Sequence, residues 1–135
     1  MPDILLFPGQ GSQFVGMGKD LFDNSNLAKD CYLKASDILG FDIADISFNG
    51  PDESLKLTQY TQPAIFVHSI VVFNILKSRG LTFSGVAGHS LGEFTAFVAA
   101  GVLTFEDAVK LVKVRSSEMA SAGEKQPGSM AAIIG

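Results

Sequence analysis

Residues 84–100 of this chain read SGVAGHSLGEFTAFVAA: a short β-compatible run, a sharp turn and an apolar helical run. Within it, Gly88-His89-Ser90-Leu91-Gly92 fits the pattern G-x-S-x-G, in which glycines flank the serine because so tight a turn leaves no room for side chains. Such a turn lifts the serine Oγ above the strand end, and the N-terminus of the next helix favours negative charge there. The stretch therefore predicts strand, turn and helix, with Ser90 as a nucleophile and the Leu91 N–H as an oxyanion donor.

The remaining hydrophobic pattern alternates strand-like and helix-like segments. Residues 41–60 lose periodicity and are expected to be irregular, with Ser47, Asp52 and Ser54 as candidate caps of short helices. Residues 123–128 are expected to form a loop. The other predicted elements are a strand at 3–7, a helix at 26–39 ended by Gly40, a helix opened by Gln62-Pro63 and closed near Gly80, a helix from Thr104 to about Ala122, and a strand at 129–134.

This alternation predicts an α/β fold on a parallel sheet. The last residues, 129–135, are apolar strand material without a partner. About three strands with no closing helix would leave an apolar edge exposed, which complete domains usually cover. We therefore expect an incomplete core.

Composition excludes several classes of protein. The chain has 135 residues, is 47% hydrophobic and 18% charged, and carries a net charge of −4, so it is a folded domain rather than a solvated tail. The acidic balance argues against nucleic-acid binding, and no run of apolar residues is long enough to span a membrane. A single cysteine, Cys31, forms neither an intrachain disulfide nor a thiolate metal cluster. We expect a cytoplasmic protein without a metal.

Three blocks of sequence carry a resemblance to a known family: residues 7–13 (FPGQGSQ), 61–64 (TQPA) and 88–93 (GHSLGE). In order and spacing they resemble the malonyl-CoA:acyl carrier protein transacylases and the acyltransferase domains of fatty-acid and polyketide synthases. The resemblance implies an α/β-hydrolase-like core with an inserted ferredoxin-like subdomain, in chains more than twice this long. Residues 1–128 would then be the amino-terminal part of that core, and 129–135 would lead into the subdomain, where the chain is truncated.

The same resemblance implies a function. Malonyl would pass from coenzyme A to the phosphopantetheine thiol of acyl carrier protein through an ester on Ser90, with coenzyme A thioester as substrate and no cofactor. The backbone N–H of Gln10 would join that of Leu91 in the oxyanion hole, and Arg115 would hold the malonyl carboxylate. Gln62 matches a residue of the family block and is a candidate substrate-binding residue, although its place beside Pro63 is equally explained by a helix start.

The helix pattern around Arg115 and the geometry of the turn around Ser90 give independent evidence on these roles. Arg115 falls on the mostly apolar face of its helix with Ala108, Leu111 and Met119, a costly place for a guanidinium unless an anion meets it. Alternatively, Arg115 reaches solvent or caps a nearby carbonyl. His89 adjoins Ser90, but successive residues of such a turn point apart, so we expect His89, Gly88 and Gly92 to steady the turn rather than act on substrate.

A general base is missing from this set. In the resembling family it is a histidine far downstream, and His68 here lies among apolar residues, where a histidine is more often part of the core. We expect the chain alone to be nearly inactive and to need the remainder of its own chain or a complementary polypeptide. Two other functions stay open: a serine hydrolase or thioesterase of the α/β class, and a non-catalytic acyl-binding fragment.

Overall fold

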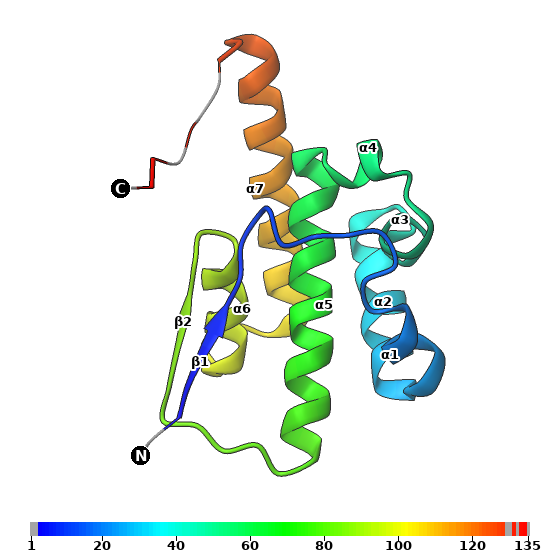
Figure 1. Cartoon of the computed structure of the whole chain (residues 1–135), viewed down its shortest axis with the longest axis vertical. Coiled ribbons are helices and arrows are strands. Elements are labelled where there is room, and N and C mark those ends of the chain that lie inside the picture. Colours follow the sequence, from blue (N-terminus) through cyan, green and yellow to red (C-terminus); the bar gives the residue numbers. More distant parts are fainter. Residues whose placement is uncertain (1–2, 129–130, 132, 135) are drawn as a thin grey trace.

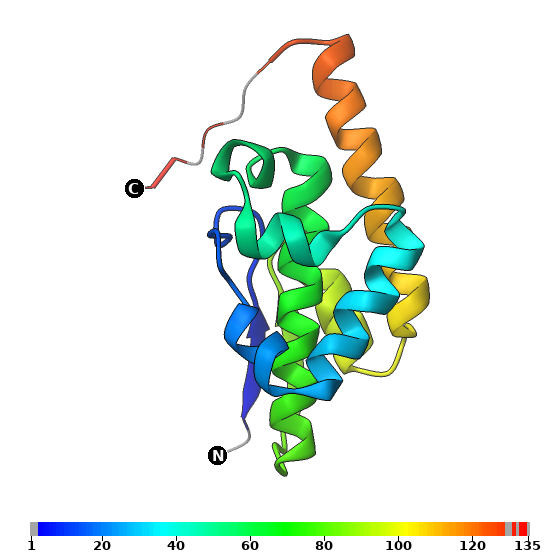
Figure 2. The same cartoon turned by 90° about the vertical axis from the view of Figure 1, so that its right-hand side faces the viewer.

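The computed structural model describes residues 3–128, 131 and 133–134. Helix α5 runs through the centre of the molecule, with β1, β2 and α6 on one side and α1, α2 and α3 on the other (Figure 1). In both views the last turns of α7 project beyond the N-terminal end of α5 (Figures 1 and 2). The elements, in chain order, are β1 (Ile4–Phe7), α1 (Lys19–Asn24), α2 (Asn26–Leu39), α3 (Ile43–Asn49), α4 (Asp52–Leu55), α5 (Thr58–Ser78), β2 (Gly85–Gly88), α6 (Gly92–Ala99) and α7 (Phe105–Lys125).

The sheet consists of β1 and β2 within the described residues. The two strands are parallel and pair from Ile4 with Gly85 to Phe7 with Gly88. Parallel strands need a crossover, which the helices α1 to α5 supply. The predicted α/β class and the parallel pairing are confirmed, and both strands end side by side. The third strand expected at 129–134 lies partly outside the described residues, because 129, 130 and 132 are not described.

Helix α5 forms the centre of the core, as its nearly continuous apolar sequence predicts. Among its fully buried side chains are Phe66, Val67 and Ile70. The predicted start was wrong: the helix begins at Thr58, so Pro63 lies inside it rather than in its first turn. Proline there removes the bond to the carbonyl of Gln59, a residue that is exposed and can bind water instead.

Capping residues set the ends of the two other long helices. Helix α2 has the predicted bounds, with the Ser25 hydroxyl accepting from the Ala28 N–H and Gly40 in the left-handed conformation at φ 85°. The Thr104 hydroxyl caps α7 as predicted, accepting from the Asp107 N–H at 3.1 Å. The predicted end of this helix at about Ala122 was wrong: α7 continues to Lys125, so the loop begins later than expected.

The stretch expected to be irregular contains two short helices, α3 and α4. Asp42 caps α3 by accepting from the Asp45 N–H, whereas Ser47, Asp52 and Ser54 lie inside the helices instead of capping them. Helix α1, six residues long after Gly18, was not predicted. Elements this short span less than two turns, so they carry no readable periodicity.

Strand β1 leaves apolar side chains uncovered. Ile4 is 55% exposed and Leu6 is 76% exposed. The expected apolar exposure at the sheet is therefore present. Within the part of the chain that the structure describes, no helix is both long and apolar enough to cross a membrane.

Candidate functional site

Ser90 occupies the turn between β2 and α6 in a strained conformation. Its φ is 53°, the one positive φ at a non-glycine residue within the described ranges. Holding a side-chain-bearing residue in this region costs about 1–3 kcal/mol. Backbone bonds fix the turn: the His89 N–H donates to the Phe7 carbonyl at 3.0 Å, and the Gly92 N–H donates to the His89 carbonyl at 2.9 Å. Ser90 itself is exposed, so its hydroxyl faces solvent at the end of the sheet.

Three glycines allow close packing at this turn. A Cβ on Gly88 would lie 2.1 Å from the carbonyl carbon of Gly92, and a Cβ on Gly92 would lie 2.2 Å from the Phe7 carbonyl oxygen. A Cβ on Gly9 would lie 2.5 Å from the His89 carbonyl oxygen. Backbone atoms occupy each of these positions, so no side-chain rearrangement makes room. Gly9 and Gly92 therefore allow the end of β1 to approach the turn, and Gly88 allows the start of α6 to fold back over the end of β2.

A cleft of about 750 Å³ opens beside Ser90. The side chain of Gln10 donates to the Thr58 hydroxyl at 3.4 Å, which ties the loop after β1 to the start of α5. Neither the backbone N–H of Gln10 nor that of Leu91 donates to an acceptor within the described residues. The cleft is lined by Gln10, Thr58, His89, Ser90, Met119, Ala122, Gly123, Gln126 and Gly128.

Arg115 reaches Ser90 from α7. Its Nη2 donates to the Ser90 Oγ at 3.0 Å, and its guanidinium carbon lies 5.7 Å from the centre of the Phe94 ring. The apolar surroundings expected from the helix pattern are only partly present: Ala108 is buried, but Leu111 is 46% exposed and Met119 is 40% exposed. The half-buried guanidinium therefore stands beside the serine rather than in the core.

Gln62 lies behind Arg115 and is 1% exposed. Its Oε1 accepts from Arg115 Nη1 at 2.5 Å, and its Nε2 donates to the Met119 sulfur at 3.3 Å. Both ends of the amide are thus engaged by α7. Gln62, Ser90 and Arg115 form one connected group, although they come from α5, the turn before α6, and α7.

The two histidines lie in different surroundings. His89 is exposed and lines the cleft, and its Nδ1 approaches Gly9. The Nδ1 of His68 lies near Gly18, is buried and has no partner within the described residues. Burial lowers the pKa of His68 below its ordinary value of 6.5, with Asp20 opposing the shift weakly. His68 is absent from the cleft lining; it is half-buried and lines a separate pocket with Leu6 and Phe7 of β1.

Sequence reasoning did not predict six of the nine residues that line the cleft: Thr58, Met119, Ala122, Gly123, Gln126 and Gly128. Thr58 lies in the stretch taken as irregular, although its spacing of four from Gln62 is that of one helix face. Met119 follows Arg115 by one turn, and that spacing marks it as a neighbour of the guanidinium. Extending the helical pattern of α5 back to residue 58 would have placed Thr58 on the same helix face as Gln62.

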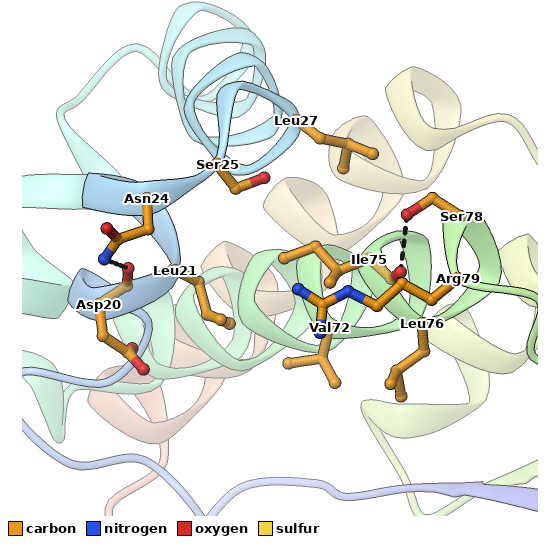
Figure 3. Close-up of a pocket in the computed structure, with 10 residues that line it drawn as sticks. All are labelled: Asp20, Leu21, Asn24, Ser25, Leu27, Val72, Ile75, Leu76, Ser78 and Arg79. Carbon is orange, nitrogen blue, oxygen red and sulfur yellow. Dashed lines mark hydrogen bonds between the residues drawn. The ribbon is translucent and has the colours of Figure 1, made fainter.

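A second pocket lies away from Ser90, between α1, the start of α2 and the C-terminal part of α5 (Figure 3). Its volume is about 410 Å³, and its floor is apolar with Asp20 and Arg79 at the rim. Figure 3 shows Arg79 lying along α5 over this floor. Among the described residues, no group of three His, Cys, Asp or Glu side chains is placed to hold a metal ion.

An exposed serine with a positive φ thus stands at the strand–helix turn of a G-x-S-x-G motif, with the Arg115 guanidinium on its Oγ. Residues 4–134 match the family model described as the acyl transferase domain, and the chain belongs to this family.

The chain is similar to malonyl CoA-acyl carrier protein transacylases. It is 46% identical to that of Bacillus subtilis over 96% of this chain and 41% of the relative, and 45% identical to that of Staphylococcus aureus over 97% and 42%. The malonyl-CoA:ACP transacylase of Synechocystis superposes with a TM-score of 0.87 at 46% identity, over 90% of this chain and 41% of that one.

A second solved structure is a type II PKS acyl-carrier protein in complex with its malonyl-transacylase, with a TM-score of 0.83 at 40% identity over 88% and 39% of the two chains. The present chain thus spans about two fifths of the length of these relatives.

Proposed function

We propose that the chain provides the nucleophile-bearing part of a malonyl-CoA:acyl carrier protein transacylase. Ser90 Oγ attacks the thioester carbonyl of malonyl-CoA, and the backbone N–H groups of Gln10 and Leu91 stabilise the tetrahedral oxyanion. The C–S bond breaks, and the coenzyme A thiol leaves with the proton lost by Ser90. The phosphopantetheine thiol of the carrier protein then attacks the seryl ester, and the Ser90 hydroxyl is restored.

The contact between Arg115 and Ser90 supports this proposal most strongly. A guanidinium within hydrogen-bond distance of the nucleophile stands where a carboxylate one carbon beyond the reacting carbonyl arrives. Malonyl has such a carboxylate and acetyl does not, so an acetyl group leaves the arginine unpaired. A site for neutral esters has no use for this charge, which favours acyl transfer from malonyl over hydrolysis of neutral esters.

The general base comes from outside this set of residues. Of the two histidines, His68 lies outside the cleft that contains Ser90, and His89 makes no hydrogen bond to Ser90 among the described residues. We propose that a complementary segment, part of a longer chain or a separate polypeptide, supplies the base and covers the exposed Ile4 and Leu6 on an α/β-hydrolase-like core. Loss of such a base typically lowers the rate about 10²–10⁴-fold.

The experiment is intact-mass analysis after incubation with malonyl-CoA, with Ser90→Ala and Arg115→Ala in parallel. A slow single malonyl adduct that is absent from Ser90→Ala, is reduced in Arg115→Ala and forms faster with a complementary segment supports the proposal. Equal adduct formation from acetyl-CoA and malonyl-CoA contradicts it. Malonyl-CoA binding without any adduct, even with the complementary segment present, identifies an acyl-binding fragment instead.

A further inference from the structure

We infer that Gln62 is a positioning residue: it holds the Arg115 guanidinium at Ser90 and does not itself touch the acyl group. At 1% exposure, Gln62 has no surface to offer a ligand. Both ends of its amide are bound by α7, with Oε1 accepting from Arg115 Nη1 and Nε2 donating to the Met119 sulfur. The inference rests on the proposed function only for the identity of the ligand, because the contact exists without one.

Counting donors shows that Gln62 fixes Arg115 without using up its binding capacity. A guanidinium carries five N–H groups. One donates to Gln62 and one to Ser90 Oγ, so three remain. A carboxylate bound through both oxygens takes two of them. The arginine can therefore keep its hydrogen bond to Gln62 while it binds an anion. Its Nη1 group stays held by α5 in both the free and the bound state.

The chemistry of the anchor is suited to an anionic ligand. The Gln62 carbonyl is neutral, so it orients the guanidinium and leaves its positive charge in place. No ion pair between the described residues involves Arg115. A glutamate at position 62 would orient the arginine equally well but would neutralise it. The Phe94 ring adds a cation–π contact to the hydrogen bonds that Arg115 donates to Gln62 and Ser90. The Arg115 side chain is therefore ordered before a ligand binds.

The test uses the full chain and three variants of α5. Gln62→Met removes the acceptor at similar volume, Gln62→Glu keeps an acceptor but adds a charge, and Gln59→Met is the matched control on the exposed face of the same helix. The first measurement is the NMR signal of the Arg115 Nη–H groups without ligand, assigned by its loss in Arg115→Lys. We expect a shifted, exchange-protected signal in the unmodified chain, in Gln59→Met and in Gln62→Glu, and loss of shift and protection in Gln62→Met.

The second measurement is titration with malonyl-CoA and acetyl-CoA. Loss of one hydrogen bond should weaken malonyl-CoA binding about two- to tenfold in Gln62→Met and leave acetyl-CoA binding unchanged. Gln62→Glu should also bind malonyl-CoA more weakly, in spite of its ordered arginine. A merely structural role for Gln62 would not produce this separation between order and affinity.

Several results would overturn the inference. An Arg115 signal that is the same in Gln62→Met and in the unmodified chain shows that Gln62 does not position the arginine. Unchanged malonyl-CoA affinity in Gln62→Glu contradicts the need for a neutral acceptor. If Gln62→Met fails to fold, Gln62→Asn, whose amide is one methylene too short to reach, takes its place. An ordered Arg115 that depends on Gln62 in a chain binding both thioesters equally supports the inference and refutes the proposed function.

Discussion

Replacing Gly92 by alanine tests whether the Ser90 turn depends on close packing against β1. The added Cβ would lie 2.2 Å from the Phe7 carbonyl oxygen and 2.8 Å from the Pro8 carbonyl oxygen. To reach even 3.0 Å, α6 or the end of β1 must shift by at least 0.8 Å (3.0 − 2.2). Forced shifts of this kind cost about 1–3 kcal/mol, a large share of the 5–15 kcal/mol that typically holds a domain together.

The assay is urea unfolding followed by circular dichroism, with Gly123→Ala as the control. Gly123 lies in α7 with nothing within 4 Å of its added Cβ, so alanine there should raise the free energy of unfolding, by up to about 1 kcal/mol. The two substitutions are chemically identical and should have opposite signs. A free energy of unfolding for Gly92→Ala equal to that of the unmodified chain would refute the argument from close packing.

Two further predictions concern buried polar groups. Because burial lowers the pKa of His68, the unfolded chain takes up a proton first as the pH falls; stability should therefore decline below about pH 6.5, and His68→Leu should flatten this decline in urea unfolding at several pH values. An equally steep decline in His68→Leu would assign it to other groups. The Tyr32 hydroxyl is buried without a partner among the described residues, so Tyr32→Phe should leave the thermal midpoint unchanged or raise it, by an amount worth up to about 1 kcal/mol. A lowered midpoint would reveal a partner for the hydroxyl.

Much of the fold follows from local sequence signals. Ser25 and Gly40 give α2 its bounds, and the glycine pattern around Ser90 gives the strand–turn–helix unit, because both depend on residues adjacent in the chain. The predicted start of α5 was wrong because proline is common in the first turn of a helix, whereas Pro63 lies inside α5. Burial against the surrounding helices outweighs the one backbone hydrogen bond that Pro63 removes.

The connections within the candidate site could not be predicted in the same way. Gln62 and Arg115 are separated by 53 residues, and Arg115 and Ser90 by 25, so their contacts exist only after α5, α6 and α7 pack. Helical spacing identified Arg115 as unusual on its face but could not say which side chain it meets. The place of Gln62 beside Pro63 was equally explained by a helix start, and only its hydrogen bonds to Arg115 and Met119 show that its amide points toward α7.

The parallel pairing of β1 with β2 has a consequence for the order in which the molecule can be made. Ile4 pairs with Gly85, 81 residues later (85 − 4), so at about 5–20 residues per second β1 waits roughly 4–16 s during synthesis before its partner has been added. Helices α2 to α5 are complete by then and pack on one another. We expect the ribosome to release a helical platform first, onto which the sheet closes and the serine turn forms last.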